Sequence, residues 1–303
     1  MKIEVENITK SFGENSVLKG VSIEAESGKA VGILGRNGAG KTTTIRIIMG
    51  VFAPDSGEVL ADGEKINRDR IRIGYLPEER GMYPKKIIID QLVYFAVLKG
   101  MSKAEAKASA EYWLEKLQMS EHKNRRLDNL SKGNQQKIQL AATLISNPDI
   151  IILDEPFSGL DPVNAMLLEN IVREFIGSGK IALFSSHQMN YIEEFCDDIY
   201  ILNGGRIVLN GSIKKIKHSY DRSRIIISSV ELERVKNFVV NDLSRITEDC
   251  YVENDRLTVK LNASEDKGIL LEGLARGHFD IDEIKVFEPS LNDIFVEYTE
   301  AKI

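Results

Sequence analysis

Eight residues near the N-terminus, GRNGAGKT at Gly35–Thr42, have the types and spacing needed to bind phosphate groups. They fit the pattern G-x-x-x-x-G-K-[ST], in which the backbone N–H groups of a loop surround a phosphate. The glycines of the loop can adopt positive φ and place no Cβ in the way of a phosphate. Lys41 can reach the β- and γ-phosphates of a nucleotide, and the hydroxyl of Thr42 can ligate Mg²⁺. The segment therefore predicts a binding site for a nucleoside triphosphate.

The flanks of this loop support that interpretation. The apolar run Ala30–Leu34 predicts a buried strand, and Thr43–Met49 predicts a helix that ends at Gly50. A helix that begins directly after such a loop directs its N–H groups and the positive end of its dipole toward an anion. The alternative is a glycine-rich turn that binds nothing, because the pattern also occurs by chance. Identification therefore needs the other motifs of the chain.

Two carboxylates follow the most apolar segment of the sequence, DIIILDE at Asp149–Glu155. A continuous Ile/Leu run predicts a central parallel strand that is covered on both faces. Asp154 and Glu155 then lie at the carboxyl edge of the sheet, where open α/β sheets bind ligands. The next buried strand, predicted over Lys180–Ser185, brings His187 to the same edge. The alternatives are an acidic pair that only begins a loop and a histidine without a catalytic role.

Two further positions have both a structural and a functional interpretation. Ser131, in LSKGNQQ, is well placed to cap the N-terminus of a helix, and such an N-terminus after a glycine is also an anion site. Phe12 lies at the connection of two predicted antiparallel strands within residues 1–30. Its ring could stack on a nucleotide base or simply cover the edge of the sheet.

Composition bounds the class of protein. The 303 residues suffice for one large and one small domain with a substantial core, and the net charge of −6 argues against nucleic acid as the main partner. Cys196 and Cys250 lie far apart without a C-x-x-C or a histidine cluster, which predicts two free thiols in a reducing compartment. The N-terminus lacks a secretory signal, and the longest apolar stretch, Ile47–Ala53, is too short to span a bilayer. We therefore expect a cytoplasmic protein.

The element pattern predicts an α/β protein of two domains. Residues 1–215 combine antiparallel strands, a mainly parallel central sheet and a helical region over about 85–146, where Ser102 and Glu105 have capping-box spacing. Tyr112, Trp113 and Leu117 are predicted to lie on one face of a helix in the core. A basic segment after residue 213 is expected to be a solvated linker. Residues 216–303 then read strand–helix–strand–strand–helix–strand, which suggests a small ferredoxin-like α+β domain, followed by a helix capped by Ser290.

With these elements in order, residues 1–215 resemble the nucleotide-binding subunits of ABC transporters, a P-loop NTPase family. GRNGAGKT resembles Walker A, IIILDE at 150–155 resembles Walker B with its catalytic glutamate, and LSKGNQQK at 130–137 resembles the signature LSGGQ. SGLDP at 158–162 matches the D-loop, and His187 matches the switch histidine. The tail EPSLNDIFVEY at 288–298 resembles the C-terminal extension of ABC-2-type exporter ATPases, which work with a separate membrane permease.

The resemblance implies a mechanism of ATP hydrolysis with Mg²⁺. Glu155 would activate the attacking water, His187 would steady the γ-phosphate, and Lys41 would bind it. Mg²⁺ would be held by Thr42 and, through water, by Asp154, with Glu78 as a further contact. The remaining nucleotide contacts would come from Phe12 and from the loop and first helical residues, namely Gly35, Arg36, Asn37, Gly38, Ala39, Gly40, Lys41, Thr42 and Thr43. Ser131, Gly133 and Asn134 would contact the nucleotide of a facing subunit, and Asp161 belongs to the D-loop.

The resemblance also implies partners. We expect a homodimer, or a dimer with a related ATPase subunit, that closes on ATP and drives an integral-membrane permease from the inner face of the cell membrane.

Two departures from the family pattern stand out. Glu78 replaces the usual glutamine in GYLPEERGMY, and Lys132 and Asn134 replace a glycine and a glutamine in the signature. The alternatives are a soluble ABC ATPase acting on ribosomes or DNA and a small-molecule P-loop kinase. The acidic composition and the SGLDP and LSKGNQQK segments, respectively, speak against them.

Overall fold

The computed structural model describes residues 1–79 and 81–300, which form two compact units. The first unit contains residues Met1–Ile213 and the residues from Ile294 onward, and the second contains Lys214–Asp293. The sequence assigned 216–303 to one accessory domain, but the end of the last helix packs with the first unit. None of the helices in the described part of the chain combines the length and the hydrophobicity that a membrane span needs.

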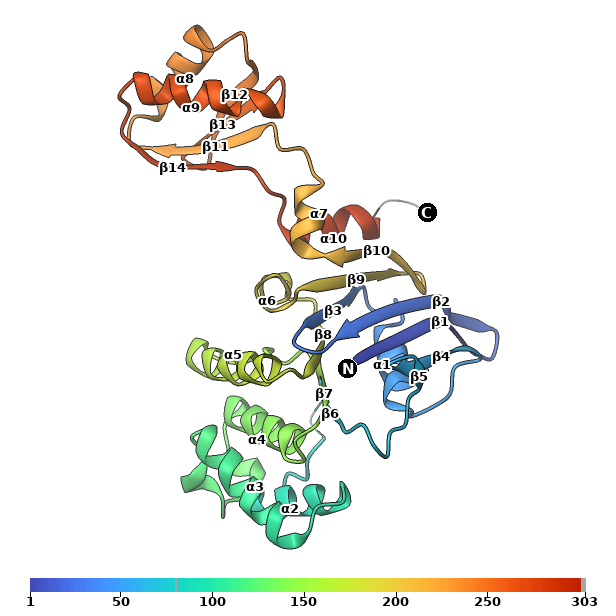
Figure 1. Ribbon diagram of the computed structural model, residues 1–303. Helices are drawn as coiled ribbons and strands as arrows, with labels where there is room; N and C mark the ends of the chain where they lie inside the picture. The colour runs from blue at the N-terminus through green and yellow to red at the C-terminus, as the bar shows by residue number, and fades with distance from the viewer. Residues whose placement is uncertain (80, 301–303) are drawn as a thin grey trace. The chain divides into compact units, whose positions relative to one another are not determined.

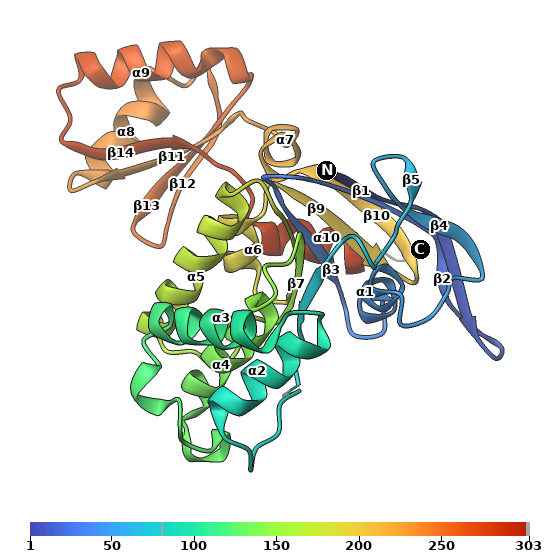
Figure 2. The same cartoon turned by 60° about the horizontal axis from the view of Figure 1, so that its bottom comes forward.

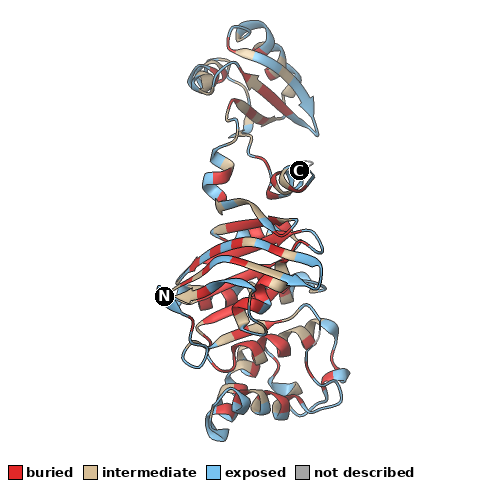
Figure 3. Ribbon diagram, turned by 90° about the vertical axis from the view of Figure 1, so that its right-hand side faces the viewer, coloured by how far each residue is buried: buried red, intermediate tan, exposed pale blue. Residues whose placement is uncertain are grey.

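The first unit is built around a six-stranded sheet (Figure 1). Five of its strands are parallel, and the edge strand β10 pairs antiparallel with β9 through a hairpin at Gly204-Gly205. The sheet order is β10 (Arg206–Ser212), β9 (Asp198–Asn203), β3 (Ala30–Gly35), β8 (Ile181–Ser185), β7 (Ile150–Asp154) and β6 (Ile73–Leu76). Every residue of β3, β7 and β8 is buried, as the red strands of Figure 3 illustrate. Burial on both faces explains why these strands are continuously apolar.

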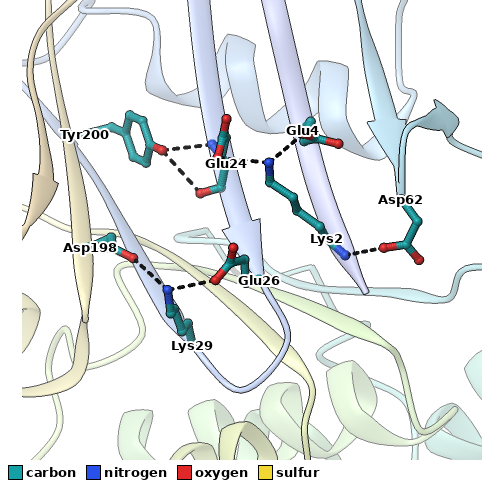
Figure 4. A network of polar contacts seen from close by, with 8 residues as sticks. All are labelled: Lys2, Glu4, Glu24, Glu26, Lys29, Asp62, Asp198 and Tyr200. Carbon is teal, nitrogen blue, oxygen red and sulfur yellow. Dashed lines mark hydrogen bonds and ion pairs between the residues drawn. The ribbon is translucent and has the colours of Figure 1, made fainter.

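A second, antiparallel sheet covers one face of the main sheet. Its order is β2 (Asn15–Glu26), β1 (Lys2–Phe12), β4 (Ser56–Ala61) and β5 (Glu64–Lys65). Its apolar side chains share one core cluster with helix α1 (Lys41–Met49) and with alternate residues of the main sheet such as Val31 and Ile152. A surface network links the two sheets: the Tyr200 hydroxyl of β9 accepts from the Glu24 backbone N–H at 2.9 Å, and Lys2 pairs with Glu24 at 3.0 Å (Figure 4).

Helices occupy the other face of the main sheet and form the helical subdomain. Gly32 of β3 permits close packing of helix α6 (Met189–Phe195), because an added Cβ would lie 3.0 Å from Ile192. Helix α5 (Pro162–Gly177) packs against β8. The helical subdomain joins α2 (Ile88–Leu98), α3 (Lys103–Lys116) and α4 (Lys132–Leu144), which contact one another and are grouped in Figure 2. Short 3₁₀ turns at Ser120–His122 and Leu127–Asn129 connect α3 to α4.

Several local predictions are confirmed and one is wrong. Ser102 and Glu105 form the capping box of α3, and both cysteines are free. Tyr112 is not a core residue: its side chain is 53% exposed and packs edge-on against Trp113, with the Lys116 ammonium over its ring. The buried face of α3 is instead lined by small and branched residues, including Ala106 and Leu114. The expected linker begins with a helix, α7 (Ile213–His218).

The second unit has the predicted ferredoxin-like topology. Its sheet is antiparallel throughout, with the order β12 (Thr247–Glu253), β13 (Arg256–Leu261), β11 (Arg224–Ser229) and β14 (Ile281–Val286). Helices α8 (Leu232–Asp242) and α9 (Lys267–Arg276, after a 3₁₀ turn at Ser264–Asp266) contribute Val235 and Leu270 to one apolar cluster with the sheet. The final helix α10 (Leu291–Glu300) is capped by Ser290, whose hydroxyl accepts from the Asp293 N–H.

Candidate functional site

The glycine-rich loop connects the end of β3 to the start of α1. Gly38 and Gly40 have φ angles of +80° and +111°, in the region that favours glycine. At Gly40 an added Cβ would lie 2.5 Å from Leu18. Helix α1 begins at Lys41, two residues earlier than the sequence pattern indicated. This geometry presents the first backbone N–H groups of α1 at the mouth of the loop, as anion binding requires.

The side chain of Lys41 is folded back onto its own loop. Its ammonium donates to the Gly35 carbonyl at 2.6 Å and, more weakly, to the Arg36 carbonyl at 3.4 Å. Burial lowers the pKa of Lys41, and the nearby carboxylates of Glu155 and Asp154 oppose that shift. The ammonium therefore lies among acceptors that an incoming phosphate would replace.

Asp154 ends β7 and is buried beside the tyrosine of the neighbouring strand. The hydroxyl of Tyr75, on β6, donates to Asp154 Oδ2 at 3.2 Å. Burial raises the pKa of Asp154, and the hydrogen bond from Tyr75 opposes this shift. Burial and the Asp154 charge together raise the pKa of Tyr75 to about 12. Tyr75 was not anticipated from the sequence, because the sequence alone does not show that its strand pairs with β7.

Glu155 is buried and accepts hydrogen bonds at both carboxylate oxygens. Oε1 accepts from the backbone N–H of His187 and lies 2.7 Å from His187 Nδ1, and Oε2 accepts from the Ser186 hydroxyl at 2.8 Å. Because a carboxylate only accepts, the hydrogen of this ring contact belongs to Nδ1 of His187. The His187 side chain is 71% exposed, so its other ring nitrogen remains accessible. Ser186 is a second residue that the sequence reasoning missed.

The backbone of Glu155 adopts an uncommon conformation. Its φ of +50° lies in the left-handed region, which costs a non-glycine residue of order 1–3 kcal/mol. A hydrogen bond from its N–H to the Ser185 carbonyl at 2.8 Å and the three side-chain contacts hold it there. Stored backbone strain of this kind is typical of functional sites.

These groups line one cavity of about 390 Å³. It is bounded by Val17 of β2, by the loop and first helical turn at residues 36–43, and by a polar set of four side chains: Glu78, Asp154, Glu155 and His187. The structure thus brings together the predicted loop, both predicted carboxylates, the predicted histidine and Glu78. A polyanion could be held here by backbone N–H groups and Lys41, with an acidic group opposite to accept a proton.

The other predicted contacts lie outside the lining of this cavity. Phe12 is half exposed and packs edge-on against Phe52, with a centroid separation of 5.6 Å. Ser131 caps α4 by accepting from the Asn134 N–H at 3.3 Å. Gly133 lies against α5, where an added Cβ would be 3.1 Å from the amide nitrogen of Asn164. Asp161 caps α5, and its hydrogen bonds from Asn164 and Val163 lower its pKa.

Comparison with known proteins gives a consistent family. Residues 18–158 match the family model described as ABC transporter, and residues 211–299 match the C-terminal domain of ATP-binding proteins like DrrA1-3. The chain is 39% identical over 296 residues to the uncharacterized ABC transporter ATP-binding protein YhaQ of Bacillus subtilis, covering 97% of both chains. It is 35% identical to the Nod factor export ATP-binding protein I of Paraburkholderia xenovorans, over 69% of this chain and 70% of that protein.

Solved structures agree with this result. An ATP-binding subunit of an ABC transporter superposes with a TM-score of 0.66 at 28% identity, covering 72% of this chain and 92% of that one. A dimeric, post-hydrolysis ATP-binding cassette with ADP and phosphate bound has a TM-score of 0.62 at 26% identity, over 70% of this chain and 98% of that one.

Proposed function

The chain belongs to the ATP-binding proteins of ABC transporters, a family of ATPases, and we propose that it powers a separate membrane permease of the exporter type. One observation carries the proposal for the site: a single cavity is lined by the phosphate loop, Asp154, Glu155 and His187. Backbone donors, a lysine, two carboxylates and an imidazole around one polyanion are the groups that phosphoryl transfer to water requires.

Lys41, Thr42 and Thr43 bind the triphosphate together with the backbone of residues 35–40. On ATP binding, the Lys41 ammonium exchanges its loop carbonyls for the β- and γ-phosphate oxygens. Phe12 stands on the hairpin whose strand β2 supplies Val17 to the cavity, and stacking on the base requires its ring to leave Phe52.

The oxygen donors beside the loop fit Mg²⁺. The described residues hold no cluster of three or more His, Cys, Asp or Glu side chains arranged for a metal ion. Mg²⁺ does not require one, because it is commonly bound by one or two carboxylates and by substrate phosphates. Thr42 directly, and Asp154 and Glu78 through water, would hold it beside the phosphates. Bound there, Mg²⁺ neutralises charge on the β- and γ-phosphates.

Glu155 is the general base, and His187 is its orienting partner. Three hydrogen bonds to Glu155 use three of about four acceptor positions of its carboxylate, which leaves one for the attacking water. Because Nδ1 of His187 carries the hydrogen toward Glu155, a donor contact from Nε2 to the γ-phosphate requires the imidazolium form.

Catalysis is completed by a second subunit. Ser131, Gly133 and Asn134 begin α4, and they do not line the cavity of their own chain among the described residues. A capped helix N-terminus can bind an anion, and the phosphates of a second subunit's nucleotide would supply one here. The dimeric cassette that resembles this chain supports placing these residues, and Asp161 beside them, opposite the nucleotide of the partner.

The helical subdomain is the docking surface for the permease. Its α2 region exposes large apolar side chains, among them Tyr83, Tyr94 and Leu98, which are 54%, 51% and 65% exposed. A hollow of about 650 Å³ between α2 and α3 is lined by apolar residues of α2, such as Ile89, Val93 and Tyr94, and by charged residues of α3, such as Lys103 and Glu111. Exposed apolar groups gathered on one subdomain are typical of protein interfaces. Docking there would hold the ATPase at the inner face of the cell membrane.

The test has two parts. In a Glu155→Gln background, ATP and Mg²⁺ should shift the protein from monomer to dimer in sedimentation, because ATP binds the closed dimer better than the monomer. Ser131→Arg should abolish the shift without loss of monomer ATP binding. The second part is purification of the tagged protein from its native host. Recovery of a polytopic membrane protein supports the permease, and recovery of ribosomes instead would favour a soluble ABC ATPase.

The composite site would be contradicted if the Glu155→Gln protein stayed monomeric at saturating ATP while the protein without that substitution hydrolysed ATP at a normal rate. The second unit could hold two chains together without nucleotide, so the dependence on ATP is the informative comparison. Export rather than import is supported by the Nod factor export relative.

A further inference from the structure

The last helix of the chain ends on the phosphate loop. The Glu300 carboxylate pairs with the guanidinium of Arg36, with 2.6 Å between Oε1 and Nη2. Arg36 is the second residue of the loop and lines the nucleotide cavity. The two partners are 264 positions apart in sequence, and both side chains are a little more than half exposed. The pair therefore joins an accessible residue of the tail to an accessible residue of the binding site.

The end of α10 is fixed at this place by other contacts. Ile294 is fully buried, and Thr299 is 8% exposed. The side-chain amide of Asn203 donates to the carbonyls of Tyr298 and Thr299, at 3.3 and 3.4 Å. Asn203 directly follows Leu202, which is the partner of Gly35 in the parallel ladder between β9 and β3. The strand pairing that positions the phosphate loop thus also positions the C-terminal turn of α10.

The electrostatic consequence concerns the affinity for polyphosphate. A helix C-terminus carries about half a negative charge, and Glu300 adds a full one, so the guanidinium of Arg36 is well matched to this end of α10. While the pair is intact, its carboxylate offsets the positive charge that Arg36 adds to the loop. Without Glu300, the loop would face a nucleotide with one additional uncompensated positive charge.

Resting on the proposed function of this cavity, we propose that Glu300 is a positioning residue that acts through Arg36 and sets the affinity of the loop for ATP. The chain leaves the first unit after Ile213 and re-enters it at Ile294 in α10. The pair therefore joins the nucleotide site to the helix by which the chain returns from the second unit. Moving the end of α10 away from the loop would raise the affinity for ATP, and returning it to the loop would lower that affinity.

Calorimetric titration of ATP and of ADP in EDTA tests this proposal, because hydrolysis does not consume the ligand without Mg²⁺. Four proteins are compared with the parent chain: Glu300→Gln, Arg36→Ala, the double variant, and Glu297→Gln as a control. The control removes the same charge one helical turn earlier on α10. Titrations at about 50 mM and 500 mM NaCl separate electrostatic from structural effects, because salt screens exposed charges.

Glu300→Gln should tighten ATP binding by about 1.5- to 5-fold at low salt, the range expected of exposed ion pairs. The gain should be smaller for ADP, should vanish at high salt, and should be absent in the Arg36→Ala background. The control should change affinity less than Glu300→Gln does. An unchanged or weaker affinity of Glu300→Gln, or the same gain without Arg36, would overturn the inference. A parent chain that binds no ATP would instead overturn the proposed function, and the inference with it.

Discussion

Replacing Glu155 by glutamine should stop hydrolysis while leaving the fold and ATP binding intact. In the structure, Oε1 faces two donors of His187, and Oε2 faces the hydroxyl of Ser186. A glutamine can direct its carbonyl oxygen at the His187 donors. Its amide can then donate to Ser186, because a hydroxyl also accepts. The contacts with His187 survive, the contact with Ser186 reverses its direction, and the ability to take a proton from water is lost.

The expected magnitudes differ between two substitutions at this position. For Glu155→Gln, turnover should fall by ~10²–10⁴, the size of a general-base contribution. Its unfolding free energy should fall by no more than about 1–3 kcal/mol, because the His187 donors keep an acceptor and only the hydroxyl hydrogen of Ser186 loses one. Glu155→Ala leaves the donors of Ser186 and the His187 backbone without a partner, at roughly 1–3 kcal/mol each. The alanine variant should therefore lose both turnover and stability.

Three measurements separate these outcomes. Phosphate release gives turnover, calorimetry gives ATP affinity, and urea unfolding of the nucleotide-free protein gives the midpoint at constant slope. Turnover of Glu155→Gln within tenfold of the parent would remove Glu155 from the role of base. Equal destabilisation by glutamine and alanine would refute the hydrogen-bond reasoning, because it would mean that the amide cannot satisfy Ser186 and His187.

Two other substitutions probe the same cavity. Lys41→Ala should weaken ATP binding itself, because its ammonium is the side-chain cation that the structure holds inside the loop; unchanged affinity in a titration would contradict this. Glu78→Ala should reduce permease-stimulated turnover more than basal turnover, because Glu78 lies both in the cavity and on the segment that leads to the helical subdomain. Equal losses in the two assays would confine Glu78 to the metal site, and no loss would make it a surface residue.

The parts of the site that were predictable from sequence are those set by local pattern. The loop glycines, the apolar run of β7 and the strand before His187 each specify an element within about ten residues. Parallel pairing then aligns their carboxyl ends at one edge. The same reasoning gave the ferredoxin-like order of the second unit, where turn residues at 254–255 mark a hairpin. Tyr112 failed because helical periodicity alone does not tell which face a small-residue helix buries.

The remainder depends on contacts that no local pattern encodes. Glu155 is strained at φ +50° because Ser186 and His187 hold it there, and a strained residue looks ordinary in a sequence. Tyr75 reaches Asp154, 79 positions later in the sequence, only because β6 pairs with β7. Arg36 and Glu300 meet because Asn203 fixes the end of α10 beside the ladder that carries the loop. In each case strand pairing or helix packing places the backbone, and this brings a charged or hydroxyl side chain within hydrogen-bond distance of a residue of the site. Residues that tune the site are therefore expected on the strands that flank β3 and β7 or directly after them, as Tyr75 on β6, Ser186 after β8 and Asn203 at the end of β9 illustrate.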